Sequence, residues 1–277
     1  MGLSQRFFSY MNKLSLVIIS LILFSCKGRM YRAGSGSMAE TIKQGEPFYV
    51  AKKNNFKRDE IVVFDFFGND YVSGMDETGH FKQHWERRVY RLVAFSGDSL
   101  YIKNGDVFVN GKITTQPPGS LTEYIIRAKE YITDLPERGD DFELPPLKDR
   151  FGDTIVYQVP LTKEEVQQFE QRKQVVFSIK KFITPAPEYE DTSLARPLAN
   201  FLWTVDNYGP LYIPQPGDTI LVTNANYRLY KNIPGIQPGK YVLKEKLYFI
   251  LGDNRHRAED SRYIGFIPHS NMYGIVK

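Results

Sequence analysis

Cysteine is almost absent from this chain of 277 residues, since Cys26 is the only one. A single cysteine excludes an intramolecular disulfide, so the cysteine content does not indicate a redox compartment. Histidine is scarce as well, and the four histidines are scattered without the spacing of a metal site. These shortages predict a protein that uses no metal ion and no cofactor.

An excess of charge of one sign is also missing. The formal net charge is +4, and the 36 basic and 32 acidic residues are spread along the chain. Because no basic block stands out, we expect no nucleic-acid partner. Hydrophobic residues make up 42% and aromatic residues 14% of the sequence. This composition excludes a disordered chain and favours one large or two small domains with a real core.

Long hydrophobic runs are limited to the N-terminus. Arg6 and Lys13 precede an uncharged apolar run, residues 14–26, which is shorter than the roughly 20 residues of a spanning helix. The run is therefore typical of a signal-peptide core. Its last residues, Leu-Phe-Ser-Cys, resemble the lipobox of bacterial lipoproteins, which implies removal of residues 1–25 and lipidation of Cys26.

The alternative for residues 1–25 is an uncleaved signal anchor. Both interpretations predict a membrane-tethered protein in contact with membrane lipid. Both also place the folded part on the extracytoplasmic, periplasmic side.

Beyond the N-terminus, short runs rich in Val, Ile, Tyr and Phe favour β-strands. Asn104-Gly105 joins two of these runs and is a strong signal for a two-residue hairpin turn. Many short strands and few helical patterns predict a mainly β fold, an antiparallel β-barrel or sandwich. The expected strands are residues 47–53, 60–67, 88–95, 99–103, 106–112, 218–223, 240–244 and 247–253.

The stretch from 114 to 205 has a different character, because proline-rich breaks interrupt it. One helix is expected inside it, over residues 161–174, where Thr162 and Glu165 form the pattern of a capping box. We interpret residues 114–205 as a partly helical insertion. It divides a β domain formed by residues 26–113 and 206–277.

Four blocks of sequence resemble the bacterial type I signal peptidases in order and rough spacing. The blocks read GSGSM-AETI, RDEIVVF, YRLVAFSGDSLYIKNGDVFVNGK and GDNRHRAEDSRYIGFIP. The resemblance covers about residues 32–112 and 200–277, and VDNYGPLYIPQPGDTI is similar to the branch with a long insertion. It implies a membrane-bound serine endopeptidase that removes signal peptides from exported precursor proteins.

The resemblance also implies roles for single residues. Such peptidases use a serine nucleophile and a lysine general base, steadied by a second serine. Ser37 matches the nucleophile, and Ser35 matches the serine that assists the oxyanion hole. Met38, directly after the nucleophile, is expected to contact substrate. A proline of the family motif is replaced here by Glu40.

The general base is the main departure from the family pattern. Counting back from Gly97-Asp98, the position of the lysine is occupied by Tyr90. The position of the serine that orients the lysine is occupied by Ala258. Burial lowers the pKa of a lysine but raises that of a tyrosine, which starts near ~10. Tyr90 would therefore need a nearby cation to act as a base.

Arg88 is the best candidate for that cation, because it lies two residues from Tyr90 on the same face of the expected strand. Lys82 and His84 are other possible bases, although neither stands at the matching position.

The remaining charged residues of the last block, Asp253, Arg255, Asp260 and Arg262, are expected to pair with one another and to brace the site. Two functions therefore stay open. The first is a signal peptidase I-like serine endopeptidase with a non-standard base. The alternative is a catalytically impaired pseudo-peptidase that binds exported or membrane-proximal peptides.

Overall fold

The computed structural model describes residues 28–69, 83–136, 138, 147–187, 193–197 and 202–277. The expected signal peptide or anchor over residues 1–25, and the predicted lipidation site Cys26, lie outside these residues. Within the described part, the structure contains no helix that is both long and apolar enough to cross a bilayer.

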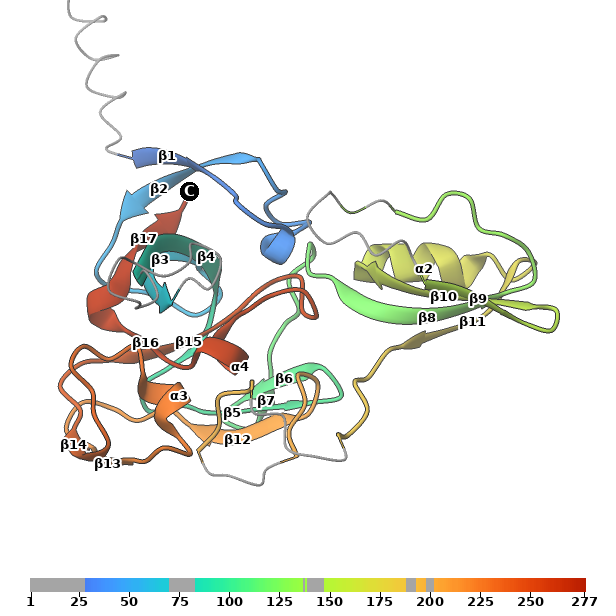
Figure 1. Cartoon of the computed structure of the whole chain (residues 1–277). Coiled ribbons are helices and arrows are strands. Elements are labelled where there is room, and N and C mark those ends of the chain that lie inside the picture. Colours follow the sequence, from blue (N-terminus) through green and yellow to red (C-terminus); the bar gives the residue numbers. More distant parts are fainter. Residues whose placement is uncertain (1–27, 70–82, 137, 139–146, 188–192, 198–201) are drawn as a thin grey trace, which may run out of the picture.

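The largest element of the fold is a curled antiparallel sheet of seven strands (Figure 1). Its order is β1 (Gly28–Arg32), β2 (Pro47–Lys52), β17 (Met272–Val276), β3 (Ile61–Asn69), β4 (Gln83–Phe95), β15 (Leu247–Leu251) and β16 (Ile267–Pro268). The curl brings Tyr31 on β1 against Arg87 on β4, with the guanidinium 5.5 Å from the ring centroid. One hydrophobic core is formed largely by side chains of this sheet, and Val62, Phe64 and Ile250 in it are fully buried.

Two smaller antiparallel sheets cover a second core. One has the order β12 (Tyr208–Tyr212), β5 (Ser99–Lys103), β6 (Asp106–Val109) and β7 (Lys112–Ile113), and the other pairs β13 (Thr219–Val222) with β14 (Gly239–Val242). The short helix α3 (Tyr227–Tyr230) contributes Leu229 and Tyr230 to this core and contacts α4 (Ser261–Ile264), which packs against β15. Lys103 pairs with Asp106, and Asn104 and Gly105 both have positive φ. The predicted two-residue hairpin turn is therefore confirmed.

The stretch expected to be an insertion forms a module of its own, which extends to one side of the seven-stranded sheet (Figure 1). Its four strands have the order β11 (Val176–Lys181), β8 (Thr122–Ala128), β10 (Thr154–Leu161) and β9 (Leu147–Phe151). The helix α2 (Lys163–Gln171) covers one face, and Phe169 on it reaches a separate core that includes Ile126 and Tyr157. We call residues 122–181 the insertion module.

The expected helix of this module is confirmed, including its start. Thr162 caps α2, because its hydroxyl accepts from the backbone N–H of Glu165. The Glu165 carboxylate in turn accepts from the backbone N–H of Thr162. The four strands were not predicted, so the sequence analysis underestimated the order of this stretch. The mainly β, antiparallel fold is confirmed, although the described sheets do not close into a barrel.

The separate core of the insertion module makes its stability testable. We expect Phe169→Ala to lower the free energy of unfolding by about 3–5 kcal/mol, because the ring is 3% exposed and leaves a cavity. Chemical denaturation measures this change. Phe177→Ala is the control, since that ring on β11 is 48% exposed and its loss should cost little. Equal effects of the two variants would contradict a packed module.

Candidate active site

The predicted nucleophile lies in a single turn of 3-10 helix, η1 (Gly36–Met38), which follows β1. Ser37 is 8% exposed, and its Oγ lies 3.0 Å from Oγ of Ser35. The two serines that were singled out in the sequence therefore form one hydrogen-bonded pair. Met38 is 1% exposed and its sulfur accepts the backbone N–H of Asp253. This side chain faces the core, so its contact with substrate stays a prediction.

The loop after β15 holds the turn that carries Ser37. The backbone N–H of Asn254 donates to the Ser37 carbonyl at 3.0 Å, and the Asn254 side-chain amide donates to the Gly36 carbonyl at 3.2 Å. We call residues 252–258 the GDNR loop. Because this loop is hydrogen-bonded to both Gly36 and Ser37, it helps to fix the position of Ser37.

Tyr90 and Ala258 meet Ser37 around Gly252. A Cβ atom built on Gly252 would lie 2.2 Å from Cβ of Ala258, 2.7 Å from the Ser37 carbonyl oxygen and 3.3 Å from Cε1 of Tyr90. Only glycine allows so close an approach. The structure thus brings together the positions that the sequence predicted for the nucleophile, the base and the orienting residue. Two of these positions carry a phenol and a methyl group instead of an amine and a hydroxyl.

Burial makes Tyr90 a poor base. It raises the pKa of Tyr90 to about 12, although the positive charge of Arg88 and a hydrogen bond with Ser37 both act to lower it. With a pKa of about 12, only about one molecule in 10⁵ carries the phenolate at neutral pH. The positive charge of Arg88 acts to lower the pKa of Tyr90, as expected, but it does not offset the larger effect of burial.

Arg88 is drawn in other directions as well. Its guanidinium forms ion pairs with Glu86 and with Glu259, the latter at 3.0 Å, and stacks 4.1 Å from the Phe66 ring centroid. The positive charge that could support a Tyr90 phenolate is therefore shared with two carboxylates. Lys82 lies outside the described residues, and the structure describes His84 by its backbone alone.

The charged residues of the GDNR loop and its continuation pair only partly as expected. Asp260 and Arg262 form the predicted pair, with two bonds of 2.8 and 2.7 Å and both side chains buried. Asp253 pairs instead with Arg91 on β4, at 2.8 and 2.6 Å, and accepts from the Thr41 hydroxyl. Sequence proximity suggested a partner inside the block, whereas the fold supplies one from a neighbouring strand.

Arg255 was also expected to pair with a carboxylate of the last sequence block. Its contacts match this expectation less well than those of Arg262 with Asp260. The side chain is buried, and this burial lowers the pKa of its guanidinium to about 10, although Asp253 acts to raise it. Among the described residues, its Nη1 atom has no hydrogen-bond partner. The nearby negative charges of Asp253 and Asp260 partly offset the cost of burying the positive charge of Arg255.

The sequence analysis missed a buried pair beside the site, His256 and Asp206. Nε2 of His256 lies 2.9 Å from Oδ2 of Asp206, which also accepts from the N–H and the hydroxyl of Thr184, at 2.8 Å each. Burial alone would raise the pKa of Asp206, but the hydrogen bond and charge of His256 and the bonds from Thr184 lower it to about 2. The signal available in the sequence was a histidine directly after the Gly-Asp-Asn-Arg motif.

Similarity to known proteins extends over nearly the whole chain. The family model for signal peptidases, peptidase S26, matches residues 9–277. The chain belongs to the signal peptidase family. It is 34% identical over 70 residues to signal peptidase I of Haemophilus influenzae, a stretch that covers 23% of this chain and 20% of that protein.

Two further signal peptidases show the same pattern of partial similarity. Signal peptidase I of Aquifex aeolicus is 49% identical over 35 residues, 13% of this chain and 14% of that protein. Signal peptidase I U of Bacillus subtilis is 28% identical over 124 residues, 42% of this chain and 57% of that protein. Each match spans less than two thirds of the relative.

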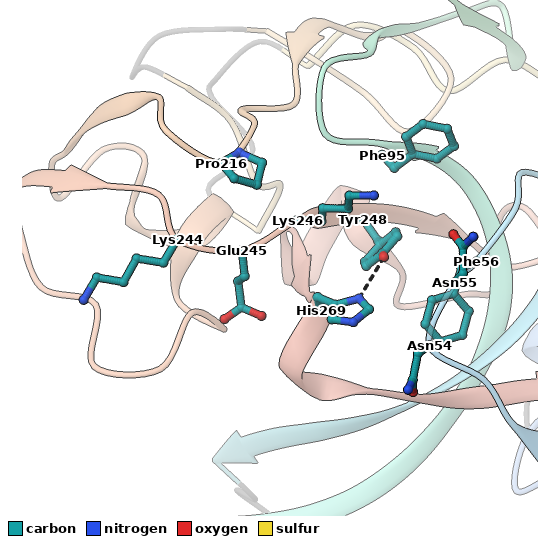
Figure 2. A pocket seen from close by; sticks show the side chains of 10 residues that line it. All are labelled: Asn54, Asn55, Phe56, Phe95, Pro216, Lys244, Glu245, Lys246, Tyr248 and His269. Carbon is teal, nitrogen blue, oxygen red and sulfur yellow. Dashed lines mark hydrogen bonds between the residues drawn. The ribbon is translucent and has the colours of Figure 1, made fainter.

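The structure also contains a cavity of about 640 Å³, and Figure 2 shows the side chains that line it. Phe56 packs edge-on against Tyr248, whose hydroxyl is 2.9 Å from Nδ1 of His269. None of the residues that meet around Gly252 lines this cavity. In this member of the signal peptidase family, the cavity is therefore separate from the candidate active site. Its full lining is Asn54, Asn55, Phe56, Phe95, Pro216, Lys244, Glu245, Lys246, Tyr248 and His269.

The ionisation of Tyr90 can be measured by the absorbance of phenolate. In the difference between the natural chain and Tyr90→Phe, we expect no ionisation step below pH ~10, because burial holds the pKa at about 12. The same difference in denaturant should show a step near ~10. A step near neutral pH in the folded protein would overturn the assignment of Tyr90 as a protonated phenol.

The pair of Arg91 and Asp253 gives a second prediction. Arg91→Met should lower the free energy of unfolding by about 3–5 kcal/mol, since it leaves a fully buried carboxylate without its partner. Thermal or chemical denaturation measures the loss, and adding Asp253→Asn should restore part of it. Lys181→Met, which breaks an exposed pair with Asp106, is the control and should cost below about 1 kcal/mol. A similar cost for both single variants would show that the buried pair is not a structural requirement.

Proposed function

We propose that this chain binds the signal peptides of exported precursor proteins on the extracytoplasmic side of the membrane and that its own chemical step is impaired. The observation that carries this proposal is the replacement of base and orienting residue together. Tyr90 and Ala258 both adjoin Ser37, and the phenol stays protonated at neutral pH. A serine hydroxyl attacks poorly unless a base within hydrogen-bond reach takes its proton.

The strand arrangement supports binding of an extended peptide. β15 pairs with β4 only from Arg91 onward, whereas every residue of β3 pairs with the part of β4 from Gln83 to Arg91. Before Arg91, the strand pairs of the described part join β4 to β3. We expect an extended peptide to add beside β4 on the side where β15 begins, through backbone hydrogen bonds that end at Tyr90, beside Ser37.

The start of the fold supports a place at the membrane surface. β1 begins at Gly28, close behind the apolar run and Cys26. Met30 on β1 and its cross-strand partner Tyr49 on β2 are each 59% exposed. Either predicted anchor, a lipid on Cys26 or an uncleaved segment, would hold this apolar pair near the bilayer.

A second candidate function is peptide-bond cleavage with Tyr90 as the base. The hydrogen bond with Ser37 and the charge of Arg88 favour it, since both lower the pKa of the phenol. The retained Ser35–Ser37 pair is also consistent with catalysis. On this alternative the chain is a signal peptidase I-type serine endopeptidase with a non-standard base.

One set of variants separates the two candidates. Residues 27–277 in detergent are offered a fluorogenic signal-peptide substrate, with binding and cleavage measured in parallel. We expect the natural chain to bind without cleaving. The double change Tyr90→Lys with Ala258→Ser should raise cleavage by at least ~10²-fold, because it restores a general base and its orienting hydroxyl.

The control is the triple variant that adds Ser37→Ala, in which cleavage should disappear while binding remains. Cleavage by the natural chain that is lost in Ser37→Ala would favour the second candidate. Absence of peptide binding by the natural chain would overturn the first.

A further inference from the structure

The segment that leads into the insertion module passes beside the candidate active site. Gly119 accepts from the backbone N–H of Glu40 at 2.9 Å, and Ser120 forms an antiparallel bridge with Glu40. On its other side, Leu121 donates to the Asp253 carbonyl at 2.8 Å and accepts from the Arg255 N–H at 3.1 Å. The entry segment, residues 119–121, therefore lies between the segment that follows Ser37 and the GDNR loop.

This contact is close and buried. Ser120 and Leu121 are completely buried. A Cβ atom on Gly119 would lie 2.9 Å from Oγ1 and 3.0 Å from the backbone nitrogen of Thr41, so only glycine fits without displacement. The entry segment thus constrains the position of residues 40 and 41, two and three residues after Met38.

A buried arginine adds a second connection. Nη1 of Arg138 lies 2.7 Å from Oε1 of Glu40, and Nη2 pairs with Glu165. The Arg138 side chain is 9% exposed. Burial would raise the pKa of Glu40, but Arg138 and Lys43 hold it below its usual value. The Glu40 carboxylate therefore stays charged at neutral pH, and one guanidinium joins it to Glu165.

The two partners of Arg138 belong to different parts of the molecule. Glu165 completes the capping box of α2, in the insertion module. Glu40 follows the nucleophile and stands where the family motif has a proline. The departure from the motif and the insertion are thus joined by one ion-pair network.

The exit of the module contacts the same GDNR loop. After β11, Thr184 donates twice to Asp206, which pairs with His256. The Phe182 ring lies 6.0 Å from the His256 ring. Entry and exit therefore both reach the loop that holds the Ser37 carbonyl, from opposite ends of the insertion.

We propose that the insertion module positions the segment that carries Ser37, and that Arg138 is the positioning residue through its pair with Glu40. Binding of a signal peptide at the site then depends on the state of the module. The peptide part of this inference rests on the proposed function, whereas the positioning part does not.

Two readouts test the proposal in the full chain in detergent. The first is the dissociation constant for a signal peptide. The second is hydrogen exchange of the amides of Glu40 and Ile42, which donate to Gly119 and Met38. We expect Arg138→Met to weaken peptide binding at least ~10-fold and to speed this exchange by a similar factor. Exchange across β8 and β10 should stay slow.

Matched variants separate positioning from mere stabilisation of the module. Arg172→Met removes an exposed ion pair with Asp134 in the same module and should change neither readout. Glu40→Gln should reproduce the effect of Arg138→Met, and the double variant should be no worse than either single one. Glu165→Gln, which removes only the partner inside the module, should have the smaller effect.

The opposite ranking would overturn the proposal. If Glu165→Gln reproduced the effect and Glu40→Gln had none, Arg138 would only stabilise α2. If Arg138→Met failed to fold, Glu40→Gln alone would still decide, because a slow exchange at Glu40 and Ile42 in that variant contradicts positioning. If the natural chain bound no signal peptide, the proposed function would fail, while hydrogen exchange would still test the role of Arg138.

Discussion

The carboxylate of Asp253 is the contact on which the geometry of the site depends. It joins Arg91 on β4, Thr41 after the nucleophile, and the GDNR loop that contains Asp253 itself. Its charge is fully buried, so it is tolerated only with the fork of hydrogen bonds that Arg91 supplies. Such a pair adds little net stability, but it allows one relative arrangement of three chain segments. The strand of the base, the turn of the nucleophile and the loop between them are thereby held in register.

That arrangement does not depend on which side chain occupies the position predicted for the base. Asp253 and Arg91 fix positions whatever side chain stands at position 90. A phenol packs well in the pocket and keeps its proton, because the apolar surroundings that would release a proton from lysine retain one on tyrosine. A tyrosine at the position predicted for the base therefore needs no change in the fold, and an alanine at position 258 is accommodated in the same way.

Much of the fold could be predicted from sequence, because alternating apolar residues and turn motifs act locally. The Asn104-Gly105 turn and the capping box of Thr162 and Glu165 are examples. The convergence of Ser37, Tyr90 and Ala258 followed from motif spacing. The partner of Asp253 could not be predicted, since it depends on which strand lies beside the loop. The strands of the insertion module were missed because proline-rich breaks suggested loops, and the joint role of Arg138 appears only once distant segments are packed.

The point at which β15 joins β4, Arg91, has a consequence for the solubility of the protein. The edge of a strand is a template on which an extended chain can add, including another copy of the same edge, so it is an aggregation hazard. Here the residues before Tyr90 include Glu86, Arg87 and Arg88, whose charges are held by neighbouring groups. Charges at an edge discourage the stacking of apolar strands. The stretch that could accept a peptide is thereby protected against indiscriminate pairing.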